Sequence, residues 1–211
     1  MKYLYDPPLV LKKIFNDFYW HTNNNKVLLT FDDGPNPGTT ELILKELSDR
    51  NIRALFFCVG ENAQKYPDLI KSIISEGHSI GNHTFNHKII TRISKQESVE
   101  QIKKTNLLFE EKFNLSLTYF RPAHGKFKLS TSKLLSEQKL KNVMWSLLTY
   151  DYKNELSIVK FVVKYYLNKN SIIVLHDSNK SKSIIVDSIN TIAEEAEKRN
   201  FMFGDAKECL S

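Results

Sequence analysis

The chain has 211 residues, of which 41% are hydrophobic and 26% charged, and it carries a formal net charge of +6. These values are ordinary for a soluble globular protein of one domain, and no run of about 18 apolar residues is present to span a membrane. The lysines and arginines are scattered in pairs, with no basic tract among aromatic residues, so nucleic-acid binding is not indicated. The positive charge is compatible with an anionic partner, such as a nucleotide-linked or acidic glycan.

The first 25 residues precede the first predicted strand. Leu11, Ile14, Phe15 and Phe18 have the i, i+3, i+4, i+7 spacing of an amphipathic helix over residues 9–20, which we expect to cover the bottom of the sheet or barrel.

The apolar run at residues 9–11 is followed by Lys12 and Lys13 and is too short for a secretory signal. Cys58 and Cys209 make no disulfide framework. The sequence therefore predicts a cytoplasmic protein, with export without a leader as the alternative.

Apolar runs alternate with amphipathic segments along the rest of the chain. Strands are expected at residues 27–29, 54–59, 79–81, 117–120, 143–147, 171–175 and 201–203. Helices are expected at residues 41–50, 66–74, 95–112, 130–138, 157–167 and 184–199. This alternation predicts an α/β fold built on a parallel sheet or barrel.

Polar residues interrupt the apolar runs at the predicted strand ends. They are Asp32 and Asp33, His83, Arg121, Asp151 and His176. Because the carboxyl ends of parallel strands share one face of a barrel, we expect these side chains to converge.

His83 and His87 are four residues apart, a spacing that places both imidazoles on one side of a helical turn. With Asp33 as third ligand they would hold a divalent metal and leave a position for water. Asp32 could then accept a proton from that water, and His176 could protonate a leaving amine. The alternatives are a solvated turn at Asp32 and Asp33, a chance histidine pair on the surface, and a buried structural histidine at His176.

Four segments resemble the polysaccharide deacetylases, the NodB-type domain of carbohydrate esterase family four. They are TFDDGP at residues 30–35, HTFNH at 83–87, RPAHG at 121–125 and LH at 175–176. The resemblance covers about residues 26–205. It implies a distorted (β/α) barrel of about seven parallel strands, with a catalytic domain at residues 26–211 and a helical extension at residues 1–25.

The resemblance also implies a role for each matching residue. Asp32 would be the catalytic base, oriented by a bidentate Arg121, and His176 the general acid, tuned by Asp151. The metal ligands would be Asp33, His83 and His87. The ion would be one divalent metal, usually zinc, with cobalt or another divalent ion as alternatives.

Three departures from the family pattern involve four positions, Ala123, His124, Leu148 and Tyr152. RPAHG replaces the usual RPPYG, Tyr152 replaces a tryptophan, and Leu148 stands where many relatives have an aspartate. His124 would donate its main-chain N–H to the oxyanion, and Tyr152 and Leu175 would line the acetyl pocket. These departures concern substrate choice more than catalysis.

The resulting hypothesis is a metal-dependent hydrolase that removes acetyl groups from an N-acetylated amino sugar and releases acetate. Alternatives are hydrolysis of another amide, an imide or an acetyl ester at the same site, and a non-catalytic sugar-binding relative. A phosphohydrolase is less favoured because no glycine-rich phosphate loop is present. The expected partner is a carbohydrate, and the oligomeric state stays open.

Overall fold

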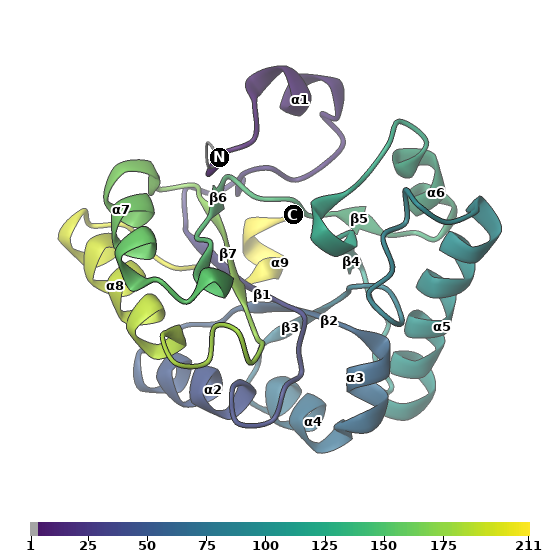
Figure 1. Ribbon diagram of the computed structural model, residues 1–211, viewed down its shortest axis with the longest axis horizontal. Helices are drawn as coiled ribbons and strands as arrows, with labels where there is room; N and C mark the ends of the chain where they lie inside the picture. The colour runs from purple at the N-terminus through teal and green to yellow at the C-terminus, as the bar shows by residue number, and fades with distance from the viewer. Residues whose placement is uncertain (1–3) are drawn as a thin grey trace.

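The computed structural model describes residues 4–211, which form a curled parallel sheet with helices around its outside (Figure 1). The strands are β1 (Leu28–Asp32), β2 (Leu55–Cys58), β3 (Ser79–Asn82), β4 (Tyr119–Phe120), β5 (Lys141–Asn142), β6 (Leu147–Leu148) and β7 (Ile172–His176). Their order is β5-β4-β3-β2-β1-β7-β6, and all neighbouring pairs are parallel. The predicted distorted barrel of seven parallel strands is confirmed.

The larger helices cover the convex face of this sheet (Figure 1). They are α2 (Thr40–Asp49), α4 (Pro67–Ser75), α5 (Lys95–Phe113), α6 (Thr131–Glu137), α7 (Leu156–Tyr166) and α8 (Ile185–Lys198). Shorter pieces are α1 (Leu9–Ile14), α3 (Gly60–Lys65), α9 (Ala206–Cys209) and the 3₁₀ turns η1 (Ala123–Gly125) and η2 (Asp151–Lys153).

Alternate residues of each strand face the two sides of the sheet. In β1, Leu29 and Phe31 pack in the large core between sheet and helices. Leu28 points into the barrel, where it meets residues of β2 and the last helix, α9. The bottom of the barrel is therefore filled by the C-terminal helix. This leaves the carboxyl ends of the strands to form the other, open end.

The N-terminal segment lies along the gap between the two edge strands, β5 and β6 (Figure 1). The main-chain N–H of Tyr19 donates to the Asn142 carbonyl at 2.9 Å, and that of Leu148 donates to the Tyr5 carbonyl at 2.9 Å. The segment therefore joins both edges of the open barrel by main-chain hydrogen bonds.

The helix expected over residues 9–20 is present only as α1 (Leu9–Ile14), and its expected place at the barrel bottom is wrong, because α9 fills that end. The helix ends at Ile14, which is 58% exposed, whereas Phe15, Phe18 and Trp20 are buried in irregular chain against Met144. Phe15 and Phe18, which suggested a longer helix, belong to the loop that follows it and are buried there.

The strand expected at residues 143–147 is also wrong. Lys141–Asn142 pairs with β4 and Leu147–Leu148 pairs with β7, which are at opposite ends of the sheet order. The chain between them crosses the open side of the barrel, so it cannot pair continuously as one strand. The closing strand expected at residues 201–203 is reduced to a single bridge between Val27 and Phe203.

Across residues 4–211, no helix has both the length and the apolar character needed to cross a membrane.

Candidate active site

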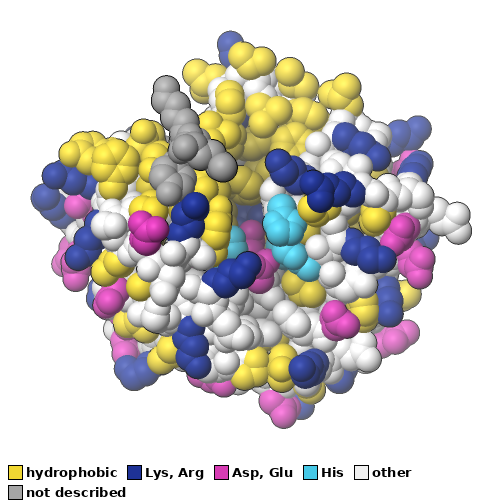
Figure 2. Space-filling model, viewed as in Figure 1, with side chains coloured by type: hydrophobic (Ala, Val, Ile, Leu, Met, Phe, Trp, Pro, Cys, Tyr) yellow, Lys and Arg dark blue, Asp and Glu magenta, His cyan; other side chains and the backbone are white. Residues whose placement is uncertain are grey.

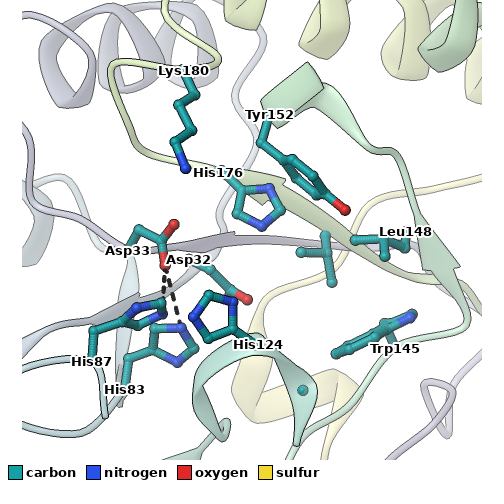
Figure 3. A pocket seen from close by; sticks show the side chains of 12 residues that line it. Asp32, Asp33, His83, His87, His124, Trp145, Leu148, Tyr152, His176 and Lys180 are labelled. Atoms are coloured by element: carbon teal, nitrogen blue, oxygen red, sulfur yellow. Dashed lines mark ion pairs between the residues drawn. The ribbon is translucent and has the colours of Figure 1, made fainter. Parts of the chain in front are cut away.

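A cavity opens at the carboxyl ends of the strands, and we call it the strand-end cavity. Figure 2 shows histidine and acidic side chains in a hollow near the middle of this face, with Lys or Arg side chains at its rim. The cavity is lined by Asp32, Asp33, His83, His87, His124, Gly125, Trp145, Leu148, Tyr152, Val174, His176 and Lys180 (Figure 3). The expected convergence of strand-end side chains is therefore present.

Asp33, His83 and His87 form a compact triad on one wall (Figure 3). Oδ1 of Asp33 lies 3.5 Å from Nε2 of His83 and 3.1 Å from Nε2 of His87. The candidate ligand atoms of the three residues all lie within 4.8 Å of one another. One ion could therefore contact all three residues.

Each of the two imidazoles, His83 and His87, has a ring nitrogen available to bind a metal. Nδ1 of His83 lies 2.8 Å from the Arg121 carbonyl, which can only accept, so this nitrogen carries the proton and Nε2 keeps its lone pair. Nε2 of His87 is buried and makes no hydrogen bond within residues 4–211. One carboxylate and two imidazoles are a donor set that fits zinc or a similar divalent ion.

The triad is built on loops and not on the helical turn that the spacing of the histidines suggested. Asp33, Thr84 and His87 have φ values of 77°, 67° and 57°, so the chain reverses direction repeatedly there. Oδ1 of Asn82 accepts the N–H of Thr84 at 2.8 Å, and Oε1 of Gln101 accepts that of Phe85 at 3.2 Å. The loop is therefore anchored to β3 and α5.

The pKa of Asp33 shows how strongly the imidazoles act on it. Burial alone would raise the pKa of this carboxyl, but the contacts with His83 and then His87 hold it well below its usual range. Asp33 is thus an anion at neutral pH, as a metal ligand must be.

Asp32 lies next to the triad and is held by a fully buried arginine. Nη1 of Arg121 donates to Oδ1 of Asp32 and to Oγ1 of Thr30, each at 2.7 Å. Nε and Nη2 of Arg121 donate to the carbonyls of Val143 and Met144 at 2.8 and 2.7 Å. The bidentate pairing expected between Arg121 and Asp32 is therefore wrong, because the other guanidinium nitrogens bind the main chain. The contact still fixes the Asp32 carboxylate and neutralises its charge.

His176 and Asp151 form the second proton-transfer pair. Nδ1 of His176 lies 2.7 Å from Oδ1 of Asp151, and the main-chain N–H of His176 donates to Oδ2 of Asp151 at 2.7 Å. Burial alone would lower the pKa of His176, but Asp151 raises it to about 9. The imidazole is therefore protonated at neutral pH. Its Nε2 makes no hydrogen bond to residues 4–211 and can donate to a ligand.

The apolar wall of the strand-end cavity includes Val174 instead of the expected Leu175. Val174 lines the cavity, whereas Leu175 is completely buried in the core beneath the helices. The pairing of Thr30 with Val174 and of Phe31 with Leu175 explains why, since paired residues of neighbouring strands point to the same side. The prediction of Leu175 as a pocket residue is therefore wrong, and the period-two alternation in β7 could have identified Val174.

Tyr152 and His124 lie where the sequence predicted them, at the cavity. The Tyr152 ring stands edge-on to His176, with ring centroids 4.8 Å apart, and the His124 ring lies 4.7 Å from that of His87. Burial, then His87, lowers the pKa of His124, so its side chain is neutral at pH 7. Trp145 and Lys180 also line the cavity, and no motif in the sequence indicated them.

Comparison with known proteins agrees with this geometry. Residues 21–143 match the family model described as polysaccharide deacetylase. A peptidoglycan-N-acetylglucosamine deacetylase of Bacillus cereus is 34% identical over 197 residues, covering 90% of this chain and 92% of the relative. The chain belongs to the polysaccharide deacetylase family.

Other relatives are longer than this chain. A second B. cereus peptidoglycan-N-acetylglucosamine deacetylase is 39% identical over 131 residues, which are 62% of this chain but 48% of the relative. The peptidoglycan-N-acetylmuramic acid deacetylase PdaC of Bacillus subtilis is 32% identical, and the match spans 35% of its length. The chain thus spans half or less of these two proteins.

Solved structures share the fold over nearly the whole chain. A peptidoglycan N-acetylglucosamine deacetylase crystallised with an N-hydroxybenzamide has a TM-score of 0.88 at 29% identity, covering 96% of both chains. A pseudoenzyme of the same family from Bacillus anthracis has a TM-score of 0.82 at 22% identity, covering 92% of this chain and 68% of its own. The fold by itself therefore does not decide activity.

Proposed function

We propose that this chain is a metal-dependent hydrolase that removes the acetyl group from an N-acetylated amino sugar and releases acetate. One observation supports this most directly. The Asp33 triad, Asp32 and His176 face a single cavity (Figure 3). Arg121 holds Asp32 and Asp151 holds His176 from behind its wall. The peptidoglycan deacetylases among the relatives support a glycan or a glycan precursor as the substrate.

Asp33, His83 and His87 would hold the ion. Bound there, a divalent cation such as zinc would polarise the acetamide carbonyl and make a water molecule more acidic. The protonated Nδ1 of His83, bonded to the Arg121 carbonyl, keeps that ring in the orientation that ligation requires.

The remaining steps fall to residues of this chain. Asp32 accepts the proton of the attacking water, and Arg121 holds the carboxylate in place for it. The main-chain N–H of His124 stabilises the negative charge that develops on the acetyl oxygen. His176, protonated because Asp151 raises its pKa to about 9, then donates a proton to the departing amine. Trp145, Leu148, Tyr152 and Val174 form the less polar wall available to the acetyl group.

Acetate release from N-acetylglucosamine oligomers by the zinc-loaded protein tests the proposal. The Asp32→Asn variant should lose about 10²- to 10⁴-fold in rate, as expected for a general base, while its zinc content stays the same. An Asp32→Asn variant as fast as the wild type would remove Asp32 from the mechanism.

Two alternatives use the same cavity. Simple acetyl esters in the same assay distinguish an esterase from an amidase, because a protonated His176 matters most for an amine leaving group. A sugar-binding relative without activity would bind the oligomers and release no acetate. The presence of both proton-transfer pairs favours the enzyme. The cytoplasmic location expected from the sequence stays a prediction.

A further inference from the structure

Lys180 lies at the mouth of the strand-end cavity, and its ammonium points towards the carboxylate of Asp33 and the ring of His176 (Figure 3). The residue belongs to the turn between β7 and α8. It also lines a neighbouring hollow that shares Asp33 and His87 with the cavity. Lys180 therefore stands at the junction of two spaces that a substrate can occupy.

The turn that carries Lys180 is held in place on both sides. Oδ1 of Asn179 accepts from Nδ2 of Asn36 at 3.0 Å, which ties the turn to the loop after β1. Oγ of Ser181 donates to the carbonyl of Ser178 at 3.1 Å and also to the carbonyl of His176. The backbone of Lys180 thus has a fixed position relative to the catalytic residues.

The other charges of the cavity are already compensated. Asp32 is paired with Arg121 at 2.7 Å, and His176 with Asp151 at 2.7 Å. Asp33 faces two imidazoles and is the anionic ligand of the proposed metal site. Each of these ionised groups has a partner that neutralises it in part or in full.

Lys180 is exposed at the rim and has no such partner among the described residues, 4–211. Within residues 4–211, Lys180 takes part in none of the ion pairs. In particular, it does not pair with Asp177 or Glu61, the other acidic residues around the neighbouring hollow. A divalent cation in the triad would make the site still more positive. Because like charges repel, this exposed ammonium and a cation in the triad would together favour an anionic group at the mouth of the cavity.

The neighbouring hollow is suited to a sugar. The amide side chains around it are those of Asn36, Asn62, Asn86 and Asn179. Amides both donate and accept hydrogen bonds, as hydroxyl groups require. A substrate in the strand-end cavity can therefore extend past Lys180 into this amide-lined hollow.

We propose that Lys180 binds an anionic group, a carboxylate or a phosphate, carried by the acetylated sugar or by the sugar next to it. The proposal rests on the proposed function and narrows its substrate class to acidic N-acetylated glycans. It also agrees with the net charge of +6.

Binding is measured first, on zinc-loaded protein with the Asp32→Asn substitution, so that the result does not depend on turnover. The probes are the disaccharide of N-acetylglucosamine with N-acetylmuramic acid and the methyl ester of its carboxyl group. They differ in one negative charge. A second pair, N-acetylglucosamine 6-phosphate and N-acetylglucosamine, tests phosphate instead of carboxylate.

We expect at least one acidic sugar to bind about tenfold or more tightly than its neutral partner, the usual strength of a charge-assisted hydrogen bond. Lys180→Met should bring this ratio close to one, and Lys180→Arg should keep most of it. Added salt should reduce the ratio only where the cation at position 180 is present.

Lys182→Met is the matched control. It removes the same charge from the same turn, but Lys182 lines neither space and its Nζ lies beside Gly38. This variant should keep the full ratio. Equal binding of acidic and neutral partners in both pairs, or a ratio that survives Lys180→Met, would overturn the role of Lys180.

Acetate release by protein with an intact Asp32 is measured separately on the same sugars. No release from any of them would contradict the proposed function, whatever the binding ratios. Release from acidic and neutral sugars alike, with no difference in binding, would leave the function standing and remove the anion site.

Discussion

Asp151 holds His176 at two points, with Oδ1 of the carboxylate on Nδ1 of the ring and Oδ2 on the main-chain N–H, both at 2.7 Å. The contact to the main chain fixes the end of β7, and the contact to Nδ1 fixes the orientation of the imidazole ring. Because Asp151 is completely buried, its charge acts on the imidazole with little screening by solvent. This pair therefore sets both the position and the protonation of the proposed acid.

Asp151→Asn should lower activity at alkaline pH and leave it nearly unchanged at acidic pH. The pKa of His176 is about 9, so the protonated acid persists in the wild type until the pH passes 9. If the pKa of His176 falls to its ordinary 6.5 in the variant, kcat/KM at pH 8 should drop roughly thirtyfold, and much less at pH 6. A pH profile of acetate release measures this. The same loss at every pH would show that Asp151 acts on geometry alone.

His87→Ala should weaken zinc binding. The variant leaves two ligands, and we expect the affinity to fall about 100-fold or more, in keeping with the loss of a direct ligand. The rise of the melting temperature on adding zinc should then nearly disappear, because stabilisation follows the ratio of free ion to Kd. His124→Ala is the matched control, since its ring lies 4.7 Å from that of His87 but outside the triad. A full zinc shift in His87→Ala would contradict the triad.

Val174 and Leu175 are neighbours in β7 and should respond in opposite ways. Val174→Phe fills the strand-end cavity, so kcat/KM should fall about tenfold or more with the melting temperature little changed. Leu175→Ala opens a hole in the core and should cost about 2–5 kcal/mol of unfolding free energy. Denaturant unfolding and acetate release on both variants measure this. A cavity role for Leu175 would instead appear as lost activity at unchanged stability.

Gly125→Ala should disturb the cavity wall. Gly125 has a φ of 61°, and a Cβ there would lie 2.2 Å from Cη2 of Trp145. We expect a loss of about 1–3 kcal/mol in stability and a higher KM, because the indole must move. Adding Trp145→Phe removes the clashing atoms and should restore part of the stability. If the double variant recovers no stability, the cost of Gly125→Ala comes from the positive φ of the backbone and not from the contact with Trp145.

Asp177→Asn should stabilise the fold at alkaline pH. Burial raises the pKa of Asp177 to about 7, well above its ordinary 3.8. The folded state thus holds this proton more tightly than the unfolded state, so the stability that Asp177 provides is complete below about pH 4 and lost as the pH rises through 7.

Asparagine has no charge to bury and can still accept from Oγ1 of Thr40, which lies 2.6 Å from the carboxylate. The metal-free variant should exceed the wild type by about 2 kcal/mol or more at pH 8, and the difference should vanish below pH 4. Thermal unfolding from pH 4 to 8 in the presence of a chelator follows this. A constant difference across that range would exclude the ionisation of Asp177 as its cause.

The sequence by itself determined the fold class and pointed to the residues of the proposed catalytic set. A buried apolar strand that ends in Asp32 and Asp33, and another that ends in His176, are local patterns, and parallel strands must bring such ends to one face. The pairing of Asp33 with His83 and His87 followed from the same argument, although the loop geometry at Thr84 and His87 did not.

Only the tertiary structure decided the wall of the cavity and the closure of the barrel. Trp145 lies in the segment that crosses from β5 to β6, and Lys180 in a turn, so neither stands at a strand end where a pattern would mark it. The closure of the gap by Tyr5 and Tyr19 depends on main-chain hydrogen bonds between residues more than 100 positions apart. Such contacts form because the edges of a curled sheet must be paired or covered, and sequence periodicity does not identify which distant segment covers them.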